Sequence, residues 1–471
     1  MDTFSFFKYS HLATDKQTAL IVFAICIALR LAPELEAYPH PIGYDVVNYY
    51  IPKVVNFQEQ WNAISNQFPL YITLLYSLST AVRLPATVLV TSVAVAIAGI
   101  FGLSLFYIGR TLLNLRIVQS LFLAIFTFFQ MSVLRTFWDL HRDVLALTAM
   151  LFVYSLLSRR EAGWKGLSIA LTLTVITVAV DRMIGALFCA SIAAYLIITR
   201  RKDVALTAIV AISLFSTLMV ASIQPSYDQR NTITGATSES GNSNFYSQRN
   251  LLIYFLVVNC LVAVPAAVGF LRMQKSLLKI PLIVSLAGSF SWLVFPEDNS
   301  LAADRWIILT GIFLSMFAGY GILHLVNKLK SNLSVIVACS ILAAYAVIGM
   351  AYALMPYDSP FILYGALENY VTNFAPATMQ FNSLDIEDND NLLRAIAEIN
   401  ENTERDAIIV GKPHWRGFME LYLKDDRIYH YSNDPQALGM TLEQQGYNVY
   451  LIKSEGNPQT TFRVENIQKD N

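Results

Sequence analysis

The chain has 471 residues, of which 55% are hydrophobic and 14% are charged, and its mean hydropathy is +0.48. Soluble proteins carry roughly 25% charged residues, so this composition excludes an ordinary soluble globule. The net charge of −1 gives no reason to expect a nucleic-acid partner, but it hides an uneven distribution. Residues 356–471 carry 18 acidic and 9 basic side chains, whereas residues 1–355 carry 16 and 24. We therefore expect a basic membrane domain over 1–355 and an acidic, water-soluble tail over 356–471.

Eleven apolar stretches approach the ~20 residues that a helix needs to cross a bilayer. The first, Leu20 to Leu29, is followed by Arg30 and Pro33 without a small-residue cleavage pattern, so we expect it to be retained. Four cysteines lie in apolar runs and indicate no disulfide or metal framework. The eleven stretches are 17–32, 84–108, 117–135, 144–158, 166–181, 183–199, 204–223, 250–271, 280–295, 305–323 and 332–354.

A twelfth stretch, 68–82, is too short to be assigned by length. If it does not cross, every second connection is basic, and six connections hold 15 of the 24 basic residues of the membrane domain but only 4 of its 16 acids. Cytoplasmic loops collect Lys and Arg, so this alternation favours an interfacial or re-entrant helix over 68–82. It predicts a multi-pass protein of the plasma membrane, with a cytoplasmic N-terminus and an extracytoplasmic tail.

Two of the predicted outer connections are long. Residues 33–83 are rich in aromatics and prolines and are expected to form helices along the membrane surface, whereas 224–249 is polar and aperiodic and is expected to be a loop. The tail has helical spacing over 392–399 and 418–423 and short apolar strands at 407–410 and 447–452, which predicts a small α/β domain.

Ionisable residues at the outer ends of the predicted spans are costly unless they are paired or wet, so they are candidates for function. Asp45 follows Gly43 and Tyr44 in the first outer loop; its alternative role is a helix N-cap. The turn FWDLHRD holds Asp139, His141, Arg142 and Asp143; their alternative role is that of interfacial anchors beside Trp138.

Three outer arginines, Arg142, Arg182 and Arg305, carry fork-shaped donors that suit a phosphate on a lipid carrier. The alternatives are that Arg305 snorkels to the interface and that Asp181 pairs with Arg182. A divalent metal site would be chemically reasonable if the acidic residues of the two loops and His141 met, but the sequence gives no certain cofactor.

This disposition resembles the GT-C superfamily of polytopic glycosyltransferases, which use sugars linked to polyprenyl or dolichyl phosphate. The first outer loop, with Gly43, Tyr44, Asp45 and Tyr49, is similar to the family's acidic loop with interfacial helices. The short second loop is also similar in position and polarity, and 303–306 (ADRW) and 317–323 (FAGYGIL) look like a late-helix segment of prokaryotic members. The resemblance covers 1–355; the longer acidic metal-binding pattern and the Trp-Trp-Asp-type motif of the oligosaccharyltransferase members are missing, so no metal dependence is implied.

The resemblance implies an inverting transfer of a sugar to a lipid, glycan or protein acceptor in the cell envelope, with Asp45 as the general base. Arg142, Arg182 and Arg305 would neutralise the leaving lipid phosphate, and Asp139 and Asp143 would orient the acceptor or the arginines. His141, Tyr44 and Tyr49 are expected to line the same substrate site.

Two other classes of protein compete with this interpretation. A transporter or flippase for lipid-linked glycans would place ionisable residues through the depth of the spans, whereas here they cluster at the predicted outer ends. A scaffold that recruits partners through its tail would leave the long first loop and the FWDLHRD turn unexplained.

Overall fold

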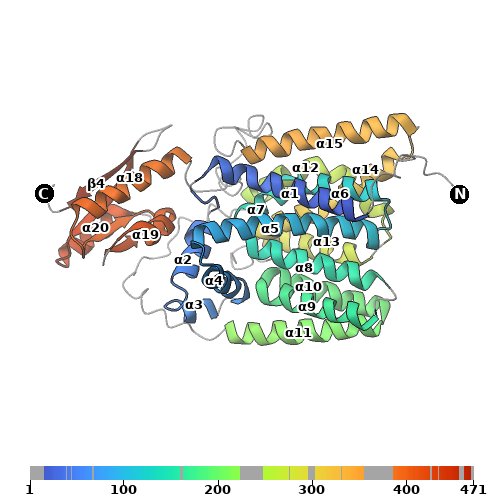
Figure 1. The fold of residues 1–471 in the computed structure, drawn as a ribbon, viewed down its shortest axis with the longest axis horizontal. Helices are drawn as coiled ribbons and strands as arrows, with labels where there is room; N and C mark the ends of the chain where they lie inside the picture. The colour runs from blue at the N-terminus through green and yellow to red at the C-terminus, as the bar shows by residue number, and fades with distance from the viewer. Residues whose placement is uncertain are drawn as a thin grey trace.

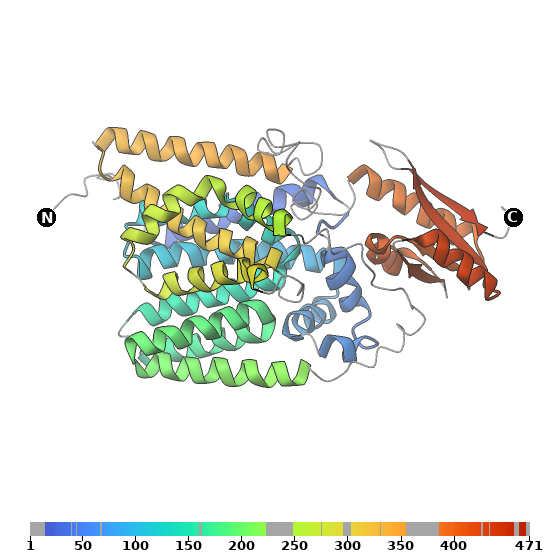
Figure 2. The same ribbon diagram turned by 180° about the vertical axis from the view of Figure 1, so that it is seen from behind.

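The computed structural model describes residues 15–38, 40–43, 45–65, 68–159, 163–222, 248–274, 276–294, 303–329, 331–354, 386–424, 427–432, 434–455 and 461–467. Long helices lie side by side in one bundle, and a small α/β domain lies beyond one end of it (Figure 1). Figure 2, the view from behind, shows the same separation. The polar loop predicted at 224–249 lies almost entirely outside the described residues, as does the predicted domain boundary at 355.

The membrane domain contains the following helices in chain order: α1 (Asp15–Glu36), η2 (Val46–Tyr50, a π-helix), α2 (Ile51–Val55), α3 (Trp61–Ser65), α4 (Leu70–Val82), α5 (Ala86–Tyr107), η3 (Ile108–Leu112), α6 (Ile117–Phe128), α7 (Met131–Asp139), α8 (His141–Ser158), α9 (Gly163–Val180), α10 (Arg182–Thr199), α11 (Lys202–Ser222), α12 (Gln248–Arg272), α13 (Ser276–Ser289), η5 (Ser291–Leu293), α14 (Ala303–Val326) and α15 (Ser331–Leu354).

Within the described ranges, eight helices are long and apolar enough to cross a membrane, or nine if the bent pair α6 and α7 forms one span. This supports a polytopic membrane protein, but it does not confirm the predicted count of eleven. The stretch predicted at 117–135 is bent by 63° between α6 and α7, and α13 has only 14 residues. α8 has 18 residues, but its first turn is polar and the helix falls outside the eight.

Burial orders the helices from the centre of the bundle to its edge. In the most apolar 18-residue stretch of α14, 83% of the residues are buried inside the protein. In the corresponding stretches of α11 and α15 the shares are 22% and 17%. α11 and α15 lie at opposite edges of the bundle in both views (Figures 1 and 2). An apolar helix face without protein neighbours suits contact with lipid, because only an apolar environment removes that face from water.

The first loop forms the short helices η2, α2, α3 and α4, which lie between the bundle and the tail (Figure 1). α4 spans 13 residues, or about 20 Å at 1.5 Å per residue, so it is shorter than the ~30 Å hydrocarbon core. Pro69 and Pro85 flank it, and Arg83 ends it in a left-handed conformation. α4 is seen end-on in Figure 1 while the bundle helices are seen from the side, which agrees with the predicted non-crossing helix.

The tail consists of α18 (Ile386–Asn402), β1 (Ile408–Gly411), η7 (Pro413–Trp415), α19 (Arg416–Tyr422), β2 (Ile428–Tyr431), α20 (Pro435–Gln444), β3 (Val449–Glu455) and β4 (Thr461–Asn466). The strands form one sheet in the order β2-β1-β3-β4, with β1 parallel to β2 and β3 and β4 antiparallel to β3.

Alternating side chains give the tail sheet two buried faces. Ile409 and Ile452 pack with α18 and α19, whereas Val410 and Leu451 pack with Leu442 of α20. The tail has the predicted α/β fold, and both predicted helices (α18 and α19) and both predicted strands (β1 and β3) are present. The sequence did not predict β2, β4 and α20.

Candidate functional site

The site lies at the end of the bundle nearest the tail, where the first loop crosses the turn between α7 and α8. Gly43 makes this crossing possible, because its φ is +106° and an added Cβ would lie 2.1 Å from the carbonyl oxygen of Trp138. Only glycine tolerates both that backbone conformation and that approach. The close contact places the segment that carries Asp45 directly above the predicted FWDLHRD turn.

Asp45 forms an ion pair with Arg305, the third residue of α14. Their closest atoms, Oδ2 of Asp45 and Nη2 of Arg305, are 3.7 Å apart. Asp45 stands at the start of η2 but makes no side-chain cap hydrogen bond, so the alternative N-cap role is not what the structure has. The two side chains keep 22% and 36% of their surface exposed, which leaves the pair accessible from outside the protein.

Arg142 is tied to the same π-helix. Its Nη1 donates to the hydroxyl of Tyr49 at 3.3 Å, and its guanidinium carbon lies 5.1 Å from the centre of the Tyr49 ring. The ammonium of Lys53 lies 3.7 Å from the centre of that ring. Burial raises the pKa of the Tyr49 phenol, and Arg142 opposes this only in part. Tyr49 is therefore a neutral hydroxyl at pH 7, flanked by two cations.

Asp143 and Asp181 place two further carboxyl groups beneath the ion pair. Both are buried, and the two carboxyl groups are close enough to interact electrostatically. Asp181 also caps α10, because its Oδ1 accepts from the backbone N–H of Ile184 at 2.9 Å. Asp143 interacts electrostatically with Arg305 and with Arg142. The charges of the first loop, α8, α10 and α14 thus form a single network.

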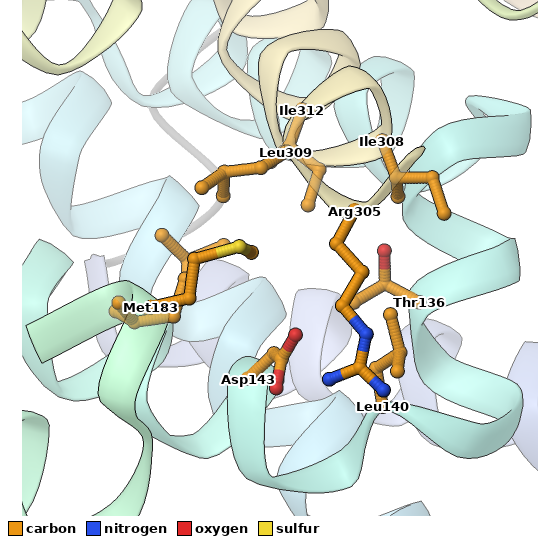
Figure 3. A pocket seen from close by; sticks show the side chains of 10 residues that line it. Thr136, Leu140, Asp143, Met183, Arg305, Ile308, Leu309 and Ile312 are labelled. Atoms are coloured by element: carbon orange, nitrogen blue, oxygen red, sulfur yellow. The ribbon is translucent and has the colours of Figure 1, made fainter. Parts of the chain in front are cut away.

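A pocket runs from this network between α8, α10 and α14. In Figure 3 the side chains of Asp143 and Arg305 point toward each other at one end of the pocket, and Leu309 and Ile312 line the opposite side. The pocket is therefore small and amphipathic, with Asp143 and Arg305 at one end and apolar side chains along its walls. The lining residues are Thr136, Leu140, Asp143, Leu147, Met183, Ile184, Arg305, Ile308, Leu309 and Ile312.

His141 has a packing role rather than a place in the pocket lining. It is 2% exposed, and its ring stacks on Tyr50 with centroids 5.3 Å apart. Tyr50 in turn packs edge-on against Tyr71 of α4, with centroids 5.3 Å apart. These ring contacts pack η2 against α8 and α4 and so help to position the segment that carries Asp45.

The structure brings five of the predicted site residues into one network and leaves others apart. Arg182 is exposed at the start of α10, and the ion pairs and electrostatic partners of the network do not include it within the described ranges. The predicted convergence of three arginines thus reduces to two, since the side chain of α10 that turns inward is Asp181. Tyr44 and the side chain of Asp139 lie outside the described residues.

In the parts of the chain that the structure describes, no group of three His, Cys, Asp or Glu side chains is arranged to hold a metal ion. Asp45 instead pairs with Arg305.

Sequence reasoning gave Asp181 a different neighbour. The adjacent Arg182 suggested a local pair, whereas Asp181 caps its own helix and meets Asp143. The signal that could have indicated this was its position directly before an apolar helix, which is typical of an N-cap.

No protein-family model matches the chain, and no curated protein is significantly similar to it in sequence. The residues of the site therefore have to carry the functional argument.

Proposed function

We propose that the chain is a membrane glycosyltransferase of the GT-C type, which moves a sugar from a polyprenyl-phosphate-linked donor to a hydroxyl acceptor at the extracytoplasmic face. The observation that carries the proposal is the partly exposed Asp45–Arg305 pair at the polar end of an amphipathic pocket. A carboxylate beside a guanidinium, next to a small pocket with apolar walls, suits a substrate that joins a phosphate to a hydrocarbon chain.

In the proposed reaction, the acceptor oxygen forms a bond to the anomeric carbon while the bond from that carbon to the phosphate oxygen breaks. The electron pair of the broken bond leaves on the lipid phosphate, and the acceptor proton passes to Asp45. Arg305 and Arg142 would stabilise the charge that develops on the phosphate, because guanidinium groups bind phosphate oxygens in pairs. Attack opposite the leaving phosphate inverts the anomeric centre.

The distribution of charge favours this proposal over a transporter. In α9, α10, α11, α12 and α14, every Asp, Glu, Lys or Arg lies within three residues of a helix end, and α15 has none. A pathway for a charged substrate through the bilayer needs polar groups at intermediate depths. The charges of these helices instead lie at their ends, and at the tail end Arg305 meets Asp45, where an enzyme would bind its substrates.

The first experiment replaces Asp45 with Asn and measures sugar transfer in membranes supplied with polyprenyl monophosphates that carry different hexoses. We expect D45N to lose about 100-fold or more in transfer rate, the effect of removing a general base. The matched control is D15N, which changes an aspartate paired with Arg110 at the other end of the bundle. Equal rates in D45N and wild type, with both proteins folded, would contradict the assignment of Asp45.

A second measurement separates binding from chemistry. Native mass spectrometry of D45N with a polyprenyl monophosphate should show the lipid still bound, because the carboxylate is proposed to act on the acceptor. If no polyprenyl monophosphate binds to the wild type, the lipid-phosphate part of the proposal is wrong.

A further inference from the structure

The tail is joined to the first loop by a hydrogen bond between residues that are 369 positions apart. The backbone N–H of Gly417 in α19 donates to Oδ1 of Asn48 in η2 at 2.8 Å. The contact lies three residues after Asp45, on the segment that carries the proposed base.

Gly417 allows this approach because it has no side chain. A Cβ at this position would lie 2.2 Å from the carbonyl oxygen of Val47 and 2.8 Å from the Cα of Asn48. Both are backbone atoms, which cannot turn aside as a flexible side chain can. The two backbones therefore pack in direct contact, and any larger residue at 417 has to separate them.

Val47 completes the core of the tail. Its side chain is 1% exposed and belongs to the same buried cluster as Trp415, Phe418 and Ile396 of the tail domain. A residue of the first loop thus fills space in the tail, whereas the neighbouring Val46 is buried in the core of the membrane bundle. Separating the two domains would expose Val47 and leave a gap among the side chains it packs against.

A second contact joins the start of the loop to the tail. Nε2 of His40 and Oδ1 of Asp390 in α18 are 2.7 Å apart. His40 is buried, whereas Asp390 is about half exposed. The loop segment between His40 and Asn48, which includes Asp45, is therefore attached to the tail at both of its ends.

Successive residues of η2 belong to different parts of the protein. Val47 and Asn48 meet the tail, while Tyr49 meets Arg142 and Asp45 meets Arg305. We propose that the tail is a positioning device for the first loop, in which Val47, Asn48 and Gly417 hold η2 and thereby fix Asp45 over Arg305. The positioning of a catalytic base rests on the proposed function; the mechanical tie between the tail and the loop does not.

The test compares Gly417→Ala with Gly439→Ala in the full-length protein reconstituted in lipid nanodiscs. Gly439 is a matched control because it lies in α20 of the same domain and its added Cβ would meet only the end of the flexible Ile467 side chain, at 2.4 Å. Hydrogen exchange of peptides that cover 45–55 reports on the loop, and peptides that cover β1 and β3 report on the tail sheet.

We expect G417A to increase the exchange rate of the 45–50 amides at least tenfold while β1 and β3 stay protected, and G439A to leave the loop unchanged. Unchanged loop exchange in a folded G417A protein would overturn the proposal. Asn48→Ala is measured in parallel as a guard against unfolding of the tail in G417A, because it removes the acceptor without adding an atom to either domain. A loop that is as protected in N48A as in the wild type would also overturn the proposal.

The kinetic consequence distinguishes this inference from the function on which it rests. In G417A we expect kcat for sugar transfer to fall about tenfold or more while KM for the donor changes less than twofold, because Asp45 is displaced but the pocket is not. A KM rise with an unchanged kcat would overturn the positioning role. If the wild type transfers no sugar, the proposed function fails, yet the exchange data still decide whether the tail holds the loop.

Discussion

The two ends of the helix bundle each have an aspartate–arginine pair that joins distant segments, and the two pairs differ in geometry. At the end away from the tail, Arg110 donates to both carboxylate oxygens of Asp15, through Nε at 2.9 Å and Nη2 at 3.2 Å. At the tail end, Arg305 and Asp45 have their closest contact at 3.7 Å. The first pair is matched fork to fork, and the second is a looser contact.

The surroundings of the two pairs differ as well. The Arg110 guanidinium also donates a hydrogen bond to the backbone carbonyl of Leu115, which joins η3 to the connection after it. Arg305 instead interacts electrostatically with the acidic side chains Asp143, Asp181 and Asp304 in addition to Asp45. Arg110 thus has one bidentate acidic partner, whereas Arg305 shares its charge among several acidic side chains.

The largest effect is expected for Gly43→Ala, which disturbs the contact between the first loop and the α7–α8 turn at the tail end of the bundle. The added Cβ meets the Trp138 carbonyl at 2.1 Å, and the φ of +106° disfavours any residue with a Cβ, so we expect a loss of more than about 3 kcal/mol in stability. Thermal unfolding of the purified protein measures this loss. Gly163→Ala at the start of α9 is the control, because its Cβ would have no atom within 4 Å.

For G163A we expect a change within about 1 kcal/mol, since alanine favours a helix over glycine. If G43A melts at the same temperature as G163A, the first loop does not depend on its contact with the α7–α8 turn.

The next largest effect distinguishes the roles of Arg305 and Arg110. Arg305→Lys keeps the charge but loses the fork, so we expect the Kd for a polyprenyl monophosphate to rise about tenfold. Arg110→Lys should leave that Kd unchanged, although it weakens the tie to Asp15. Titration of both variants with the same lipid in nanodiscs checks this, and equal affinities would remove Arg305 from the proposed phosphate site.

Sequence reasoning singled out four residues that the structure places in one network. Asp45, Arg142, Asp143 and Arg305 were recognisable because charge is scarce in this chain and costly in a membrane, although each also had a structural alternative such as an N-cap or an interfacial anchor. The span count was not recognisable, because apolar content is the same in a straight helix and in the pair α6 and α7, which bend by 63° at Phe129 and Gln130.

Contacts between distant segments left no local signal. The hydrogen bond from Gly417 to Asn48 joins two residues whose types are common in surface segments, so neither marks the contact in the sequence. The direction of the Arg182 side chain depends on how α10 is rotated in the bundle. Strand β2, the four residues IYHY, is short and alternates little in polarity, so period-two patterning does not reveal it. Its place at the edge of the sheet follows from the register of Ile428 with Ile408.

The smallest expected effect tests whether the apolar wall of the pocket holds a hydrocarbon chain. Ile312 lines the pocket two turns after Arg305 on α14, so Ile312→Trp should fill the apolar part of the pocket and leave the charged end in place. We expect KM for a long-chain polyprenyl donor to rise about fivefold, while a donor with a chain of only two isoprene units is affected less than twofold. Overpacking a buried wall costs about 1–3 kcal/mol, so thermal unfolding of the variant has to be measured alongside the kinetics.

Ile336→Trp is the matched control, because Ile336 is 61% exposed on α15 and a larger side chain there meets no pocket. Both variants place a tryptophan on a membrane helix. A difference between their KM values therefore reports on the pocket wall rather than on insertion of the helix into the membrane. If I312W raises KM equally for the long and the short donor, the chain does not occupy this wall, and the binding site would be limited to the charged end that Asp45 and Arg305 share. If only the long donor is affected, the hydrocarbon chain lies along this pocket wall, next to the looser Asp45–Arg305 pair.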